Sequence, residues 1–354
     1  MKFSLTNDFL NSNKIMFHFS KILGEYLAGK RNFYPIAIEI HPTVACNHNC
    51  IHCSYTTRNQ KHKILAPKVM DQLISSITNM GIQAVYFSGG GEPTFYKNID
   101  VYVKRLNLNG VETAIITNGS YFEESGIFDI ANCFNYIAIS VPSTNREKYT
   151  YITGRDNLSK VLAVPYRIKD IYKERSPVIG ARVVVTSRIS DDIVAIYKDL
   201  IANGFDYALF KIVRDYEDRG IGLTQSKQDA LKVLIEQNKN VFDGNITNVF
   251  NLFEYQSVPI TRCLMNEIGF IANVDSDGCV FPNIVEIGNE DFCIGNLYNN
   301  TLEEIWNSEK HQHVKANSIK KSEAELCKNC RCVSYNFIVN NFLDRLPGKY
   351  DSFI

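Results

Sequence analysis

The stretch Ala45-Cys46-Asn47-His48-Asn49-Cys50-Ile51-His52-Cys53 places three cysteines in a C-x3-C-x2-C spacing, directly after a short apolar run. Iron–sulfur clusters are held by cysteine thiolates and normally take four of them. Three thiolates in one loop therefore predict a cluster whose fourth iron has no protein ligand and is open to a reactive cofactor. A zinc loop with a distant fourth ligand and a set of ordinary thiols are the alternatives, although zinc loops usually add a second C-x2-C pair or two histidines.

The residues around this loop alternate between short β-rich runs and longer helical patterns, which is the signal for parallel βα units. Strands are predicted at 36–40, 84–88, 112–117, 136–140, 178–185 and 207–213, with a helix at 66–80 before the second strand. Six units in order predict an α/β fold with a partial (β/α)6 TIM-like barrel. Ligands of parallel barrels gather at the C-terminal ends of the strands, so the loops that follow the strands are where chemistry is expected.

The chain is predicted to divide into three parts. Residues 1–34 are a helical lead-in with Phe17, Phe19 and Ile22 at helical spacing, and residues 35–245 form the barrel. Residues 246–354 form a small C-terminal domain that packs against it, with a hairpin at 271–281 turning at an Asp-Gly pair. We expect a bound metal to stabilise this domain, because it contains six cysteines, at positions 263, 279, 293, 327, 330 and 332.

The charge and hydropathy of the chain limit which partners and which cellular compartment are expected. The chain has 38 basic and 38 acidic residues, so its composition does not point to nucleic acid or to an anionic membrane surface. No apolar stretch is long enough to span a bilayer, and no signal-peptide pattern follows the N-terminal helical pattern. A cytosolic protein is expected, in which ten reduced cysteines indicate metal more often than disulfides.

A second motif, Ser88-Gly89-Gly90-Gly91-Glu92-Pro93-Thr94, follows the second predicted strand. Consecutive glycines let backbone groups approach a ligand closely, and the carboxylate of Glu92 is expected beside them at the barrel mouth. Taken alone, the glycine run is more simply a tight turn. Because it lies one βα unit after the three-cysteine loop, the two motifs together are far more specific than either one.

Together the two motifs resemble those of the radical S-adenosylmethionine (SAM) enzymes. The resemblance implies that Cys46, Cys50 and Cys53 hold a 4Fe-4S cluster and that SAM chelates its open iron. It also implies that Gly90, Gly91 and Glu92 bind the methionyl amino group, and that His52 lies next to the adenine. In the family, reduction cleaves SAM to methionine and a 5′-deoxyadenosyl radical, which abstracts a hydrogen atom from substrate.

Other residues carry a weaker part of the same resemblance. Thr117 and Asn118 begin a T-N-G sequence after the third strand, and Ser140 is where a serine often meets the ribose. The chain reads Ile139-Ser140-Val141-Pro142 where relatives commonly have S-x-D-G. Four basic residues are candidates to hold a carboxylate or phosphate at the barrel mouth, although most surface cations bind no ligand: Arg155, Arg182, Lys211 and Arg214.

The C-terminal cysteines predict one auxiliary 4Fe-4S cluster on Cys263, Cys279, Cys327 and Cys330, with Cys293 and Cys332 as alternates. Zinc is the alternative metal for four thiolates. Gly295-Asn296-Leu297 and the Leu302-x-x-Ile305-Trp306 pattern resemble the SPASM/twitch subfamily, and the cysteine count favours the shorter twitch form. One departure is Asn283, which follows Phe281-Pro282 where relatives often carry a cysteine.

The resemblance implies a two-electron oxidation of a small polar molecule, such as a sugar or aminocyclitol, with the auxiliary cluster as electron acceptor. An external donor such as flavodoxin or ferredoxin would supply the first electron. Two alternatives stay open: peptide modification by cross-linking or by epimerisation, with Cys293 or Cys332 as hydrogen donor, and a non-catalytic iron–sulfur or zinc scaffold. The short lead-in leaves little room for a peptide-recognition domain. The sequence does not predict the oligomeric state, and His311 and His313 are expected to be solvated.

Overall fold

A nine-stranded sheet in the order β6-β5-β4-β3-β2-β1-β7-β8-β9 runs through the molecule. The structure is a computed structural model that describes residues 12–27, 33–55, 64–213, 215, 218–242, 263, 269–321, 335–336 and 338–339. The strands are β1 (Ala37–Ile40), β2 (Ala84–Phe87), β3 (Glu112–Thr117), β4 (Tyr136–Ser140), β5 (Val178–Val185), β6 (Tyr207–Ile212), β7 (Ile271–Val274), β8 (Cys279–Phe281) and β9 (Gly295–Asn296). The predicted α/β fold with six successive parallel strands is confirmed, and each predicted barrel strand ends within one residue of the observed one.

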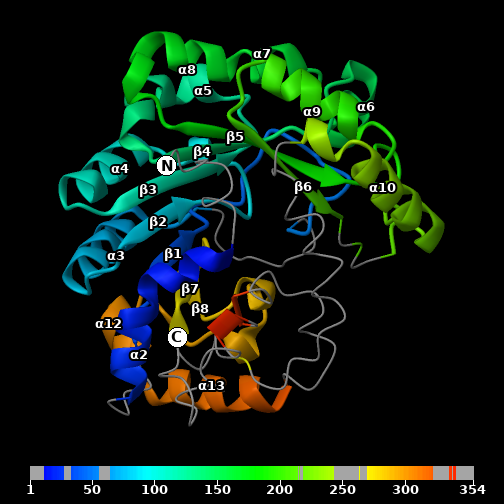
Figure 1. Ribbon diagram of the computed structural model, residues 1–354. Helices are drawn as coiled ribbons and strands as arrows, with labels where there is room; N and C mark the ends of the chain where they lie inside the picture. Colours follow the sequence, from blue (N-terminus) through cyan, green and yellow to red (C-terminus); the bar gives the residue numbers. More distant parts are fainter. Residues whose placement is uncertain are drawn as a thin grey trace, which may run out of the picture.

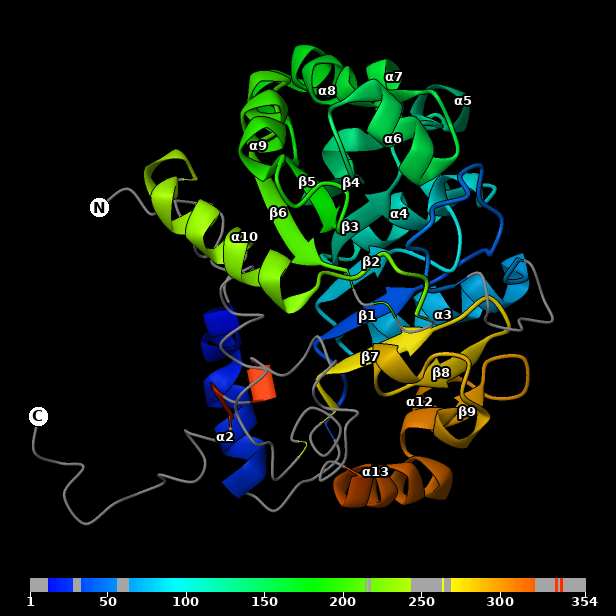
Figure 2. The ribbon, with the colours of Figure 1, turned by 90° about the vertical axis from the view of Figure 1, so that its right-hand side faces the viewer.

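Helices cover the outer face of the six barrel strands (Figure 1). They are α3 (Pro67–Asn79), α4 (Ile99–Leu108), α5 (Phe122–Ser125), α6 (Arg146–Thr153), α7 (Leu158–Leu162), α8 (Val164–Tyr172), α9 (Ile193–Ala202) and α10 (Gln225–Gln237). The C-terminal part adds α12 (Leu302–Trp306) and α13 (Glu309–Lys321), which Figure 2 shows on the side of β8 and β9. The helices α3 to α9 pack on one face of the six strands, so the opposite face is left to line the inside of the barrel.

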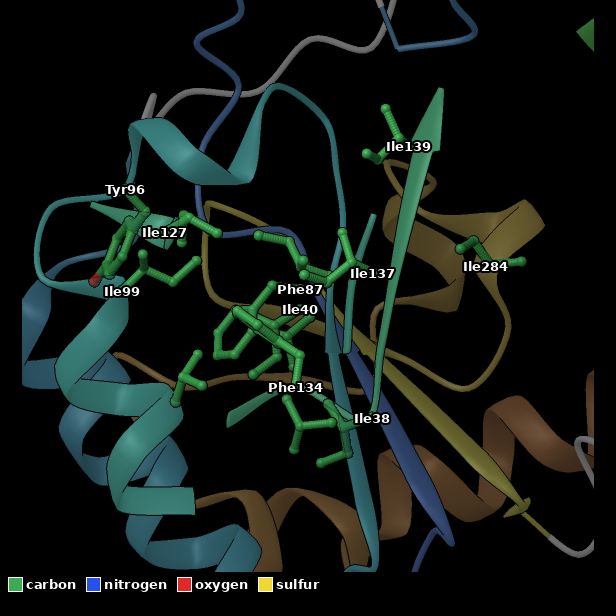
Figure 3. Packing of buried hydrophobic residues seen from close by; sticks show 14 of the residues in the cluster. Ile38, Ile40, Phe87, Tyr96, Ile99, Ile127, Phe134, Ile137, Ile139 and Ile284 are labelled. Carbon is green, nitrogen blue, oxygen red and sulfur yellow. The ribbon is translucent and has the colours of Figure 1, made fainter. Parts of the chain in front are cut away.

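The core forms between the sheet and these helices. Ile38, Ile40 and Phe87 are fully buried and alternate along their strands with residues of the inner face. They pack with residues such as Ile99 of α4 and Phe134, as Figure 3 shows. Full burial of a side chain of this size contributes about 1.5–3 kcal/mol, so this layer holds the strands in place and presents their C-terminal ends together.

The C-terminal module is joined to the barrel through the sheet itself. β7 runs parallel to β1, with Ala37 opposite Ile271 and Ile40 opposite Val274. The predicted hairpin then follows as β7 and β8, and Gly278 in its Asp-Gly turn has a φ of 76°, which favours glycine. Because the two strands are parallel, the hairpin turn of the module follows β7 at the same edge of the sheet at which the three-cysteine loop follows β1. The domain boundary at 245/246 stays a prediction.

The N-terminal lead-in consists of a 3-10 helix η1 (Ser12–His18) followed by α2 (Phe19–Leu27). Phe19 and Ile22 are buried against Phe33 and Phe270, which precede β1 and β7. Phe17 is 81% exposed, so its predicted place on the apolar face is wrong. The tighter 3-10 winding of this segment shifts Phe17 away from the face that an α-helical spacing predicts.

His311 was expected to be solvated, but it is completely buried. Its ring lies 4.4 Å from that of Trp306, and its Nδ1–H donates to the Trp306 carbonyl at 2.7 Å. Among the described residues Nε2 has no hydrogen-bond partner, and burial lowers the pKa of His311 to about 4. The local pattern missed this because Trp306 turns over the start of α13 and covers the histidine. His313, on the same helix, is exposed as predicted.

The buried histidine predicts a pH dependence of stability. Its folded pKa lies below its unfolded value, so the unfolded chain binds more protons and stability falls as the pH drops from about 6.5 towards 4. The loss should approach about 3 kcal/mol. Unfolding midpoints of His311→Phe should lack this component, whereas His313→Phe should keep it. Equal acid sensitivity of both variants would contradict the prediction.

Among the described residues, no helix combines the length and the hydropathy that crossing a membrane requires.

Candidate active site

The three-cysteine loop leaves the C-terminal end of β1 and is held by neighbours on two sides. The amides of Asn49 and Ile51 donate to the carbonyls of Thr153 and Ile152 at the end of α6, at 2.9 and 3.0 Å. Arg219 donates from Nη1 to the carbonyls of Ile51 and Cys53, both at 3.1 Å. These bonds fix the backbone on either side of Cys50.

The three thiols lie close enough to influence one another. Burial is the largest cause that raises the pKa of Cys46 and that of Cys50, which reaches about 12, and the neighbouring thiols of the loop raise both further. Thiolates gathered in this way need a cation to balance their charge. No group of three or more metal-binding side chains stands in metal-binding geometry within the described part of the chain. The chemistry of the donors, three sulfurs in one loop, suits an iron–sulfur cluster.

The glycine-rich loop after β2 packs directly on the cysteine loop. The amide of Glu92 donates to the carbonyl of Ala45 at 2.8 Å. A Cβ atom on Gly91 would lie 2.3 Å from the Ala45 oxygen and 2.5 Å from the Val44 carbonyl carbon, which are backbone atoms that cannot swing away. Glycine is therefore required here so that the two loops can touch.

The Glu92 carboxylate points into the protein and joins its own loop to the end of β3. Its Oε1 accepts from Thr94 N at 3.2 Å, Thr94 Oγ1 at 2.8 Å and Thr117 Oγ1 at 2.6 Å, and its Oε2 accepts from Asn118 N at 2.7 Å. Glu92 is 2% exposed, and this burial raises its pKa while the four hydrogen bonds oppose the shift. Its binding of a methionyl amino group stays a prediction, and that group would have to share Oε2 with the Asn118 amide.

Asn118 connects the third strand to the cysteine loop. Its Nδ2 donates to Asn47 Oδ1 at 2.8 Å and lies 3.9 Å from the Cys46 sulfur, while Asn47 Nδ2 donates to Ser120 Oγ at 2.8 Å. Asn47 and Ser120 were not among the predicted site residues. Their positions, inside the cysteine motif and directly after the T-N-G sequence, were the available signal.

Two histidines of the loop are held uncharged. Burial, assisted by the charge of Arg219, lowers the pKa of His52 to about 4, and its Nδ1 has no hydrogen-bond partner among the described residues. Burial, assisted by Arg155, likewise lowers the pKa of His48 to about 4. His48 also lies edge-on to Tyr149. Contact of His52 with an adenine stays a prediction, and a neutral imidazole suits it.

The predicted basic residues separate in space. Arg155 donates from Nε to the carbonyl of Asn47 at 2.7 Å, so it supports the cysteine loop. Ser140 and Arg182 lie directly opposite each other on β4 and β5, and Lys211 lies on β6. Arg214 is outside the described residues. The structure therefore gathers Ser140, Arg182 and Lys211 on one stretch of three neighbouring strands, and a role for each stays a prediction.

The C-terminal cysteines fall into two places. Cys279 and Cys293 lie side by side within reach of a thiol hydrogen bond, and Asn296 Nδ2 donates to the Cys279 sulfur at 3.4 Å. Cys263 instead packs with the hydrophobic cluster that contains Phe270. Three predicted ligands or alternates lie outside the described residues: Cys327, Cys330 and Cys332. The auxiliary ligand set stays a prediction, and this geometry favours the alternate Cys293 as the companion of Cys279.

A role of Cys293 as hydrogen donor to a substrate stays a prediction. Cys293 is 9% exposed, and its Sγ donates to the Gly295 carbonyl at 3.2 Å. The Cys279 interaction lowers the pKa of Cys293 to about 6 and raises that of Cys279. The two thiols therefore interact directly with each other.

Comparison with known families matches two parts of the chain. The family described as the Radical SAM superfamily matches residues 40–200, and the iron–sulfur cluster-binding domain SPASM matches residues 263–331. The matches cover both the cysteine loop with its glycine-rich partner and the cysteines from 263 to 330. They agree with the two resemblances seen in the sequence.

Curated relatives include probable GTP 3′,8-cyclases and a nucleotide dehydratase. The cyclase of Pyrococcus abyssi is 27% identical over 35% of this chain and 40% of its own length, and that of Thermococcus kodakarensis is 30% identical over 40% and 45%. The S-adenosylmethionine-dependent nucleotide dehydratase of Flammeovirga pacifica is 24% identical over 69% and 86%. The chain thus spans less than half the length of the cyclases it matches.

Two solved structures show the same fold. The structure of anSMEcpe with bound AdoMet has a TM-score of 0.62 at 21% identity and covers 85% of this chain and 88% of its own. Streptococcus suis SuiB bound to precursor peptide SuiA has a TM-score of 0.65 at 15% identity, covering 92% and 76%. At such identities the likeness concerns the fold alone.

Proposed function

Because the chain belongs to the radical SAM superfamily and carries a SPASM iron–sulfur domain, we propose that it cleaves SAM reductively and abstracts a hydrogen atom from a substrate. One observation carries the proposal: the three-cysteine loop and the glycine-rich loop are bonded together at the C-terminal ends of β1 and β2. Scaffold proteins have no need of such a paired arrangement. The family match implies SAM and a 4Fe-4S cluster as cofactors, with further iron–sulfur in the SPASM domain.

The residues present fit these groups. Cys46, Cys50 and Cys53 are three sulfur donors from one loop, the number that leaves one iron of a 4Fe-4S cluster open. When bound there, SAM supplies a 5′-deoxyadenosyl radical that removes a hydrogen atom from substrate. Gly91 allows the loops to approach, and Glu92 holds Thr117 and Asn118 against them. Asn118 and Asn47 fix the orientation of the loop beside Cys46.

For the reaction itself we propose a two-electron oxidation of a small polar molecule. A SPASM domain beside the barrel supports this, because its iron–sulfur group offers a destination for the second electron. β7 brings that domain next to β1, so the two cysteine-bearing parts share one sheet. We propose the cytoplasm as the compartment of the protein. A flavodoxin or ferredoxin there would be the partner that supplies the first electron.

Anaerobic reconstitution of the full chain tests the proposal. After reduction with dithionite, we expect methionine and 5′-deoxyadenosine in equal amounts, and low-temperature EPR signals of which SAM perturbs only one. Absence of both products while the SAM-sensitive cluster is intact would overturn the enzyme assignment. Zinc in place of the broad iron–sulfur absorption would support a scaffold. Deuterium transfer into 5′-deoxyadenosine from labelled polyols, or from labelled peptides, would separate oxidation of a small molecule from peptide modification.

A further inference from the structure

The six barrel strands do not close into a ring. Within the described residues β6 is the last strand at one end of the sheet, whereas β1, at the other end of the six, pairs with β2 and β7 (Figure 1). Because the six strands are parallel, the segment that follows β6 and the three-cysteine loop that follows β1 leave the sheet at the same edge. A contact between these two segments therefore connects the two ends of the barrel across its mouth.

The segment after β6 forms a turn around the carboxylate of Asp215. Oδ1 of this carboxylate accepts from the Arg219 amide at 2.9 Å, and Oδ2 accepts from the amides of Ile221 and Gly222 at 3.0 and 3.3 Å. The Ile221 carbonyl in turn accepts from the amide of Ser187, which follows β5, at 3.0 Å. These bonds give the turn a defined shape and hold it beside the end of β5.

Arg219 lies at the tip of this turn and contacts the three-cysteine loop. Its neighbours Asp218 and Gly220 have φ angles of 51° and 71°, in the left-handed region, so the chain reverses sharply around it. Nη1 of Arg219 donates to the carbonyls of both Ile51 and Cys53 at 3.1 Å. The guanidinium therefore holds the backbone that carries the last cysteine of the motif, and it does so from the opposite end of the barrel.

The charge of Arg219 acts on the same loop. Together with burial, which is the larger cause, this charge lowers the pKa of His52, so the guanidinium is close enough to influence the interior of the loop. Reduction of a cluster adds one negative charge, and a nearby cation stabilises the more negative form. Net charge and hydrogen bonding around the ligands set the reduction potential of iron–sulfur clusters. Because Arg219 is exposed, solvent and salt screen part of this effect.

We propose that Arg219 is a positioning residue that ties the turn after β6 to the three-cysteine loop and makes the cluster of that loop easier to reduce. The two carbonyl contacts fix the backbone next to Cys53, and the positive charge favours the added electron. The inference rests on the proposed function for the presence of a cluster. It goes beyond that function because it gives a residue outside both cofactor motifs a part in the first electron transfer.

Reduction of the full, reconstituted chain at fixed potentials, followed by EPR, tests this role. At the potential that half reduces the SAM-sensitive cluster of the parent, the ratio of reduced to oxidised cluster should fall at least about threefold in Arg219→Met. Arg219→Lys keeps the charge and should stay within about twofold of the parent. Added salt should shrink the difference between parent and Arg219→Met, because it screens an exposed charge.

Arg105→Met is the matched control. Arg105 also donates two hydrogen bonds from its guanidinium, to Asp71 and Ser75, but it lies on the outer helix α4. Its loss should leave the ratio of reduced to oxidised cluster unchanged. Iron content equal to that of the parent shows that each variant is folded. If Arg219→Met binds less iron, Arg219→Gln, which keeps an amide donor without the charge, takes its place.

Hydrogen exchange of the same proteins reports on the position of the loop. Amides of a peptide covering residues 50–53 should exchange at least about fivefold faster in Arg219→Met, with partial recovery in Arg219→Lys, because lysine lacks the planar fork of arginine. An unchanged ratio or unchanged exchange in Arg219→Met would overturn the inference, as would an equal fall of the ratio in Arg219→Lys. A parent protein without a SAM-sensitive EPR signal would instead overturn the proposed function, so the two failures are distinguishable.

Discussion

Replacing Cys50 by alanine is expected to abolish SAM cleavage. Loss of an outer partner of a metal site already costs 10–100-fold, and loss of a direct sulfur ligand should exceed about 100-fold. Cys50 is held in the middle of its loop by bonds from Asn49 and Ile51 to α6, so no other thiol of the loop can move into its place. The measurement is 5′-deoxyadenosine formed after dithionite reduction.

The cluster expected in the C-terminal module is the internal control for this variant. The iron and sulfide content of Cys50→Ala should fall by the amount of one cluster per chain. The EPR signal that SAM does not perturb should remain. Cys133→Ala is the matched substitution, because Cys133 lies outside both cysteine groups and is packed against the core. Persistent 5′-deoxyadenosine formation in Cys50→Ala would remove Cys50 from the ligand set. Loss of cleavage in Cys133→Ala as well would show that the assay reports folding.

Replacing Glu92 by alanine is expected to destabilise the whole barrel mouth. The carboxylate accepts four hydrogen bonds from Thr94, Thr117 and Asn118, and its removal leaves these donors buried and unpaired. Breaking a buried network of this kind costs about 3–5 kcal/mol. The apparent Tm should fall by about 5 °C or more. Because Asn118 also orients Asn47 beside Cys46, SAM affinity should fall with it.

Two variants separate the position of Glu92 from its charge. Glu92→Gln keeps an oxygen for Thr117 but turns an amide N–H₂ towards the Asn118 amide, so a loss of about half that size is expected. Glu112→Ala removes an exposed carboxylate at the start of β3 and should leave the Tm within about 1 °C. A Glu92→Ala variant with unchanged Tm and weakened SAM binding would instead favour a direct contact with the cofactor.

Much of the architecture was predictable because its signals are local. Short β-rich runs between helical patterns located β3, β4 and β5 at their observed bounds, and the Asp-Gly pair located the hairpin turn at Gly278. The cysteine loop and the glycine-rich loop could be paired from sequence because parallel strands bring their C-terminal ends to one edge. The same local pattern failed at Phe17 and at His311, where a 3-10 segment and a covering tryptophan override periodicity.

The C-terminal cysteines show why the spacing of cysteines along the sequence does not by itself predict which of them lie together. Counting along the chain grouped Cys263 with Cys279 and left Cys293 as an alternate, whereas the structure places Cys293 beside Cys279 and packs Cys263 with the cluster around Phe270; the ligand set itself stays a prediction. β8 and β9 bring residues 279 and 296 opposite each other, and this register carries Cys293 with it. Register depends on long-range packing, which a spacing between cysteines does not contain.

The sequence by itself determined the α/β barrel, the three-cysteine loop after β1 and the glycine-rich loop after β2, because each is written in neighbouring residues. Only the tertiary structure decided that Glu92 turns inward to Thr117 and Asn118, and that Arg219, after β6, bonds to the three-cysteine loop after β1. These relations join strands far apart in the chain, and the burial and hydrogen bonding that select them exist only once the sheet has formed. The three-cysteine loop can thus be identified from the sequence, whereas the residues that surround it in space are known only from the tertiary structure.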